Sequence, residues 1–124
     1  MNYLLSCFTA LLLLGCSSAQ QNIAVQQITA LYVADFVSDE PLQCRPTDVD
    51  LSNVDALQFF QLAQQVDYKT LHDHYNIAPC GIEGTLKYRQ QSCNWQIKAG
   101  ATGHIQCGEE RHYFACDKCE LLFN

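Results

Sequence analysis

The sequence predicts an α+β domain in which one main helix packs on an antiparallel β-meander of three to four strands, stapled by disulfides. Three observations predict this fold class. Apolar residues recur at helical spacing between residues 52 and 75, apolar and polar residues alternate between residues 84 and 116, and six cysteines follow an apolar leader. A helix repeats every 3.6 residues and a strand every 2, so the two patterns separate a helical segment from a sheet.

Residues 1–15 are predicted to be a lipoprotein signal peptide, because they carry no charged side chain and contain a run of Leu from Leu11 to Leu14. Such a stretch is too short to cross a bilayer core, which needs about 20 apolar residues, but it suits a signal-peptide core. The four residues from Leu13 to Cys16 are similar to the lipobox of bacterial lipoproteins. The resemblance implies that Cys16 receives a diacylglyceryl group and becomes the N-terminus after cleavage. The alternative is an ordinary secretory signal, cut after residues 17–19.

The first of these export routes predicts a lipid-anchored protein that faces the periplasm of a bacterial cell envelope. The second predicts a soluble periplasmic or secreted protein. In either case Cys7 is removed with the leader, and Cys16 is acylated or lost. Six cysteines in a short exported chain predict up to three disulfides, for which fifteen pairings are possible. The candidate disulfide residues are Cys44, Cys80, Cys93, Cys107, Cys116 and Cys119.

Residues 16–27 are predicted to form a tether, and residues 28–124 a single domain. Residues 28–37 are rich in β-branched and aromatic side chains, which favours a strand over a helix. Residues 39–53 contain Pro41 and Pro46 and are predicted to form a loop. Six carboxylates lie between Asp35 and Asp55, where Arg45 is the one basic residue. This acidic segment is the candidate contact for a basic protein partner, although acidic surface loops are also ordinary solvated structure.

The main helix is predicted to begin after a cap at Ser52 or Asn53 and to end near Pro79. Its apolar face is expected to contain Val54, Leu57, Phe60, Ala63 and Val66, with Leu71 and Tyr75 extending it.

The meander is predicted from residues 84–90, 93–99, 103–107 and 111–116, which are separated by short turns. One parity is apolar and is expected to face the core: Leu86, Tyr88, Trp95, Ile97, Ile105 and Phe114. Cys93, Cys107 and Cys116 share it, so we expect their side chains to point inward. The other parity is polar and is expected to face water, with a solvated His104 among its members.

An ordered set of motifs extends over residues 50–123: FFQLAQQV, LHDHYNIAPC, GTLKY, CNWQIKAGATGHI and YFACDKCELLF. In this set the chain resembles a group of small, mostly exported bacterial proteins of unknown function. The resemblance implies a common fold and supplies no activity or catalytic residues. Some small periplasmic lipoproteins are immunity proteins that neutralise antibacterial toxins.

No arrangement in the sequence predicts an enzyme. Cys116 and Cys119 have the spacing of a thiol-disulfide redox motif, but only one helical turn could follow them, and the preceding βαβ elements are absent. Metal binding is not expected, since oxidised cysteines are not thiolate ligands and His72 and His74 would diverge by about 200° on a helix. We therefore predict a non-enzymatic envelope lipoprotein without cofactor or metal. The net charge of −6 argues against a nucleic-acid ligand. It would act as a binding or inhibitor protein, such as an immunity protein. The alternatives are a redox protein that uses Cys116 and Cys119, and a structural envelope lipoprotein.

Overall fold

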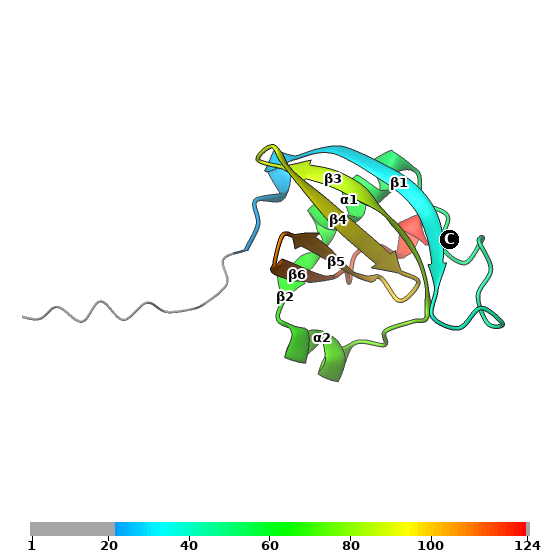
Figure 1. Cartoon of the computed structure of the whole chain (residues 1–124). Coiled ribbons are helices and arrows are strands. Elements are labelled where there is room, and N and C mark those ends of the chain that lie inside the picture. Colours follow the sequence, from blue (N-terminus) through cyan, green and yellow to red (C-terminus); the bar gives the residue numbers. More distant parts are fainter. Residues whose placement is uncertain (1–21, 124) are drawn as a thin grey trace, which may run out of the picture.

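The protein is mostly β: six antiparallel strands form one sheet in the order β1-β3-β4-β5-β6-β2, accompanied by two short helices (Figure 1). This description comes from a computed structural model and covers residues 22–123. The predicted α+β fold, with one main helix on three to four strands, is therefore wrong. The error arises because strands extend the sheet on both sides of the predicted meander, and because a strand divides the predicted main helix into two short helices.

The strands are β1 (Ile28–Ser38), β2 (Gln64–Val66), β3 (Cys80–Tyr88), β4 (Gln91–Lys98), β5 (Thr102–Cys107) and β6 (Glu110–Ala115). The α-helices are α1 (Asn53–Leu62) and α2 (Tyr68–His74), and two single 3₁₀ turns span Val25–Gln27 and Glu120–Leu122. The predicted meander is confirmed as β3 to β6, and the predicted strand at residues 28–37 is confirmed as β1.

The predicted long helix is interrupted by a strand. Ser52 caps α1 as predicted, because its hydroxyl accepts a hydrogen bond from the Asp55 backbone N–H and the Asp55 carboxylate accepts one from the Ser52 N–H. The chain becomes extended at Ala63, where φ is −71° and ψ is 153°. Residues 64–66 then pair with β6 as strand β2. Asp67 caps a second helix by accepting a hydrogen bond of 2.7 Å from the Thr70 N–H.

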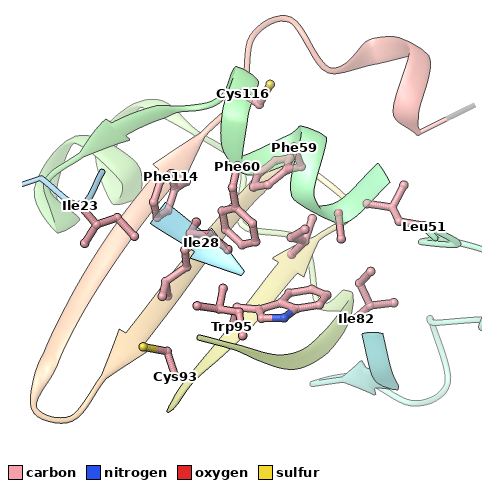
Figure 2. Packing of buried hydrophobic residues seen from close by; sticks show 14 of the residues in the cluster. Ile23, Ile28, Leu51, Phe59, Phe60, Ile82, Cys93, Trp95, Phe114 and Cys116 are labelled. Carbon is pink, nitrogen blue, oxygen red and sulfur yellow. The ribbon is translucent and has the colours of Figure 1, made fainter. Parts of the chain in front are cut away.

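The buried face of α1 also differs from the prediction. Ala56, Phe59 and Phe60 are fully buried, whereas Val54, which the helical pattern placed inside, is 75% exposed. Leu57 is half-buried. Figure 2 shows Phe59 and Phe60 projecting from α1 toward the sheet. The helix therefore packs on the sheet through residues 56, 59 and 60 rather than through residues 54, 57 and 60.

The core centres on the Phe60 ring (Figure 2). Its centroid lies 5.0 Å from that of Phe114, 5.1 Å from that of Phe59 and 5.9 Å from that of Trp95, all in edge-to-face arrangements. The Trp95 indole N–H donates a 3.0 Å hydrogen bond to the Thr85 carbonyl, so its polar atom is satisfied although the side chain is buried.

All six candidate cysteines are oxidised in pairs, which confirms the prediction of disulfide bonds. Cys93–Cys107 joins β4 and β5 inside the core, with a Cα–Cα distance of 4.5 Å. Cys44–Cys80 fastens the loop after β1 to the start of β3, and Cys116–Cys119 closes a turn after β6. The proposed lipidation site Cys16 and the predicted signal peptide lie outside the described residues.

The segment before β1 is attached to the domain. Ile23 is buried, and both its backbone N–H and its carbonyl bond the Gln65 side-chain amide, at 2.9 and 2.7 Å. The Ala24 N–H donates to the Tyr88 hydroxyl at 3.0 Å. The portion of the predicted tether from Ile23 onward is thus packed on the folded domain. Within residues 22–123, no helix is long and apolar enough to cross a membrane.

Candidate binding groove on the polar face of the sheet

The face of the sheet opposite α1 carries two rows of polar side chains, because residues paired across adjacent strands project to the same side. Glu83, Gln96, His104 and Tyr113 are successive partners across β3, β4, β5 and β6. The next row along the strands contains Thr85, Asn94, Gln106 and Arg111. We call these eight residues the polar face.

The polar face is hollowed. A cavity of about 370 Å³ lies over both rows and is lined by seven of the eight residues, all except Tyr113. A second hollow of about 190 Å³ adjoins it at Gln96 and His104 and reaches Lys98, Tyr113 and the α2 residue Leu71. The first hollow is within the range of about 300–1,000 Å³ that is typical of small-ligand sites, and the second enlarges it. α2 therefore bounds one end of a groove that runs over the polar face.

Charged groups in and beside the groove are bonded to neighbouring protein groups. The Lys98 ammonium lies 2.9 Å from the Asp39 carboxylate, and only 12% of the Lys98 side chain is exposed. The Gln96 amide donates to the Glu83 carboxylate at 3.3 Å. The Arg111 Nε–H donates to the Gln106 side-chain carbonyl at 2.8 Å. These bonds hold the polar side chains in defined orientations.

His104 lies at the centre of the groove and is partly buried, which corrects the expectation that it is simply solvated. Burial, together with the positive charges of Arg111 and Lys98, lowers the pKa of His104 from 6.5 to about 4. The imidazole is therefore neutral at pH 7, with one ring nitrogen that donates a hydrogen bond and one that accepts.

Two tyrosines flank the α2 end of the groove. The rings of Tyr68 on α2 and Tyr113 on β6 lie 5.4 Å apart, and Tyr68 is 56% exposed. His72 continues this aromatic group, with its ring centroid 6.0 Å from that of Tyr68. The groove thus combines a polar floor with an aromatic wall that solvent and ligands can reach.

Neither His112 nor His72 lines the two hollows that His104 lines. His112 shares the inward parity of Phe114 and is buried, and its Nε2 lies 3.6 Å from a Glu110 carboxylate oxygen. His72 lies on α2, where its Nδ1 is 3.3 Å from the Asp73 carboxylate. Across residues 22–123, no group of three or more His, Cys, Asp or Glu side chains is arranged to hold a metal ion.

The Cys116–Cys119 disulfide is inaccessible: Cys116 is 7% exposed and Cys119 is 1% exposed. Thiol-disulfide exchange requires a thiolate to reach one of the two sulfurs. Burial of both residues therefore argues for a structural rather than a catalytic bond.

The predicted acidic segment, Asp35 to Asp55, is divided among three elements: Asp35 lies on β1, Asp55 lies on α1, and the other four carboxylates lie on the loop between them. After β1 the chain forms a loop, residues 39–52, that projects beyond the body of the domain in Figure 1. We call it the acidic loop. Asp39, Glu40, Asp48 and Asp50 are exposed on it, and so is the whole side chain of Leu42.

The comparisons with known proteins give no relative: no protein-family model matches the chain, and no curated protein or solved structure is detectably similar to it. Functional interpretation therefore starts from the groove and the acidic loop themselves.

The neutral state of His104 is testable by titration. We expect its imidazole to protonate with a midpoint near pH 4 in the folded protein and near 6.5 in the unfolded chain. As the pH falls from 6.5 to 4, the unfolded state takes up a proton that the folded state does not, so stability decreases over this window. Above pH 6.5 the imidazole is neutral in both the folded and the unfolded state, so it causes no loss of stability there. NMR titration of the histidine ring protons and urea unfolding across this range measure both effects.

The substitution His104→Gln serves as the control, because it removes the titrating group while keeping a polar side chain. It should reduce the loss of stability between pH 6.5 and 4. A His104 midpoint close to 6.5 in the folded protein would contradict the argument from burial.

Proposed function

We propose that the protein is a non-enzymatic binding protein of the bacterial envelope, anchored by a lipid on Cys16, that binds a basic protein partner through the acidic loop. An inhibitor or immunity protein that blocks an incoming enzyme is the form of this function that we favour. The observation that carries the proposal is an acidic surface with an exposed apolar apex, built on a loop fixed by a disulfide.

The side chains of the acidic loop match the composition of a protein interface. Leu42 is fully exposed next to Pro41, and Glu40 and Asp50 are exposed carboxylates on the same loop. Interfaces commonly surround an apolar contact with a polar rim, where charges increase association rates more than they increase affinity. A basic protein would therefore be attracted by the carboxylates and contact Leu42.

The acidic loop is attached to the domain along its length. Cys44 is bonded to Cys80, the Asp39 N–H donates to the Pro79 carbonyl at 2.9 Å, and the Asp39 carboxylate is paired with Lys98. Val49 and Leu51, at its other end, are buried. A loop that is held before binding loses less conformational entropy when a partner docks, and this supports tight association.

The position of the loop suits a membrane-anchored binder. The segment that precedes β1 is attached at Tyr88, at the C-terminal end of β3, whereas the acidic loop is bonded to Cys80 at its N-terminal end. Eight residue steps along β3 separate these points by about 26 Å. With the lipid on Cys16, the acidic loop would lie on the side of the domain away from the anchor.

Charge reversal tests the proposed surface. We expect the double substitution Glu40→Lys and Asp50→Lys to slow association with the partner by on the order of tenfold at low salt, with a smaller effect at high salt. The partner is first obtained by co-purification of the full-length lipoprotein from detergent-solubilised envelopes, and rate constants are then measured with the purified pair. Leu42→Ala should mainly increase the dissociation rate, since it removes an apolar contact.

Glu109→Lys is the matched control. Glu109 is an exposed carboxylate in the β5–β6 turn, beside Cys107, at the opposite end of the sheet from Cys80. It should leave the association rate close to that of the unmodified protein. A partner that is not basic, or one whose association is slowed equally by Glu109→Lys, would refute binding through the acidic loop.

A further inference from the structure

We propose that the groove on the polar face is a saccharide-binding site that accepts one or two sugar rings of an uncharged glycan. This site lies on the sheet rather than on the acidic loop, so the inference is independent of the proposed protein partner. It rests on the chemistry of the polar face, on the aromatic wall and on the dimensions of the groove.

The floor of the groove presents planar side chains that both donate and accept hydrogen bonds. Three are amides, from Asn94, Gln96 and Gln106, and they lie on two adjacent strands. The Gln106 amide is already bonded at both ends, to Arg111 and to the Gly108 carbonyl, so Asn94 and Gln96 are the amides that a ligand would contact. Neutral His104 also offers one donor and one acceptor. A sugar carries neighbouring hydroxyl groups that each donate and accept, so a planar amide can contact two of them together. The polar face offers this arrangement in two parallel rows.

The charges of the groove favour an uncharged ligand. Lys98 is paired with Asp39, Glu83 accepts a hydrogen bond from Gln96, and Arg111 donates to Gln106. A charged ligand would have to compete with these bonds, whereas a hydroxyl can add to them as a donor to Glu83 or as an acceptor from the Asn94 amide.

The aromatic wall completes the site. A pyranose ring has polar edges and C–H faces, and the C–H faces pack against aromatic rings. Tyr113 and the exposed Tyr68 provide such rings where the second hollow meets α2. The hydroxyls of a sugar packed there would be directed toward His104 and Gln96, which line the same hollow.

The size of the groove supports a short segment of glycan. The hollow over the amide rows measures about 370 Å³, and the one beside Tyr113 measures about 190 Å³. They meet at Gln96 and His104, so two linked rings could occupy them together.

NMR titration of the isotope-labelled, disulfide-bonded protein tests the site. The probes are glucose, N-acetylglucosamine and di-N-acetylchitobiose, with acetate as an anionic comparison. We expect the saccharides to shift the backbone signals of β4 and β5 and the ring signals of His104, with the disaccharide binding most tightly. Asn94→Ala should weaken binding by about fivefold to tenfold, the effect of losing one hydrogen-bonding side chain.

Gln58→Ala is the matched control, because Gln58 is an exposed amide on α1, on the other side of the sheet. It should not change the affinity for the disaccharide. The proposal is overturned if none of the three saccharides shifts signals from the polar face, or if acetate shifts them and the saccharides do not. The second result would identify an anion site around His104 and Arg111. These outcomes do not depend on the acidic loop, so the charge-reversal experiment can fail without changing them.

Discussion

Replacing Phe60 by alanine is expected to lower the free energy of unfolding by about 3–5 kcal/mol, the usual cost of removing a buried aromatic side chain. Phe60 is fully buried and makes edge-to-face contacts with Phe59, Trp95 and Phe114. Its truncation leaves a cavity among rings that belong to α1, β4 and β6. Urea unfolding monitored by Trp95 fluorescence measures the loss, because Trp95 is the single tryptophan in the chain.

Val54→Ala is the control for this experiment. Val54 lies on the same helix and belongs to the same predicted apolar stripe, but it is 75% exposed. Its substitution should change stability by less than about 0.5 kcal/mol, as is typical of surface positions. Comparable losses for the two variants would show that α1 packs through the predicted face instead of the observed one.

Removal of the Cys44–Cys80 disulfide, by alanine at both positions, is expected to cost about 4 kcal/mol. In the loop-entropy account, the contribution of a disulfide grows with the length of chain that it closes. This bond has a sequence separation of 36, compared with 14 for Cys93–Cys107 and 3 for Cys116–Cys119. The same account predicts about 3 and about 2 kcal/mol for those two bonds. Denaturant unfolding of the three double variants measures the free energy of unfolding that each loses, and so ranks the three disulfides.

The Cys44–Cys80 variant should also lose affinity for the proposed protein partner, because the acidic loop is no longer fastened to β3. The Cys116–Cys119 variant serves as the control, since its disulfide lies outside that loop. An equal loss of affinity in both variants would indicate general destabilisation and not a specific effect on the loop. A larger cost for Cys116–Cys119 than for Cys44–Cys80 would contradict the entropic ordering.

The sequence was sufficient to predict the meander because its strands are buried on one face. The apolar positions that alternate along β4 and β5 are the buried ones: Trp95, Ile97 and Ile105 all lie in the core. Cys93 and Cys107 follow the same parity, so their inward direction could be predicted, and that prediction is confirmed. Their partners could not be predicted, because pairing depends on which strands are neighbours and parity does not reveal that.

The long helix was predicted wrongly because tertiary pairing outweighed local periodicity. Ala63 and Val66 extend the apolar spacing of a helix, but Gln64–Val66 gains backbone hydrogen bonds to β6 by becoming a strand. Asp67 is the local signal for the break, since it caps α2 through Thr70. An Asp followed three residues later by Thr is only a weak sign that a helix begins there. The sequence does not reveal that residues 64–66 pair with β6, which lies almost fifty residues further along the chain.

The polar groove could not be predicted from the sequence, because the alternation of apolar and polar residues along the strands predicts only that the polar side chains face solvent. Gln96 and His104 carry no motif, and they become neighbours only through the register of β4 and β5. The hollow over them also depends on α2, which the predicted continuous helix did not place there. The lowered pKa of His104 follows from the same assembly, because it requires burial together with Arg111 and Lys98.

The acidic loop lies at one end of β1 and the packed segment from Ile23 to Gln27 lies at the other. This placement has a mechanical consequence for the proposed lipoprotein. β1 runs from Ile28 to Ser38, so it connects the two ends directly. If Cys16 carries the proposed lipid and a partner bound at the loop is pulled, tension would pass along β1, and its hydrogen bonds to β3 would be loaded in shear. Cys44–Cys80 would transmit part of that force covalently to β3. The weakest link would then be the two hydrogen bonds between the Ile23 backbone and the Gln65 side-chain amide, whose rupture would lengthen the tether while leaving the sheet intact.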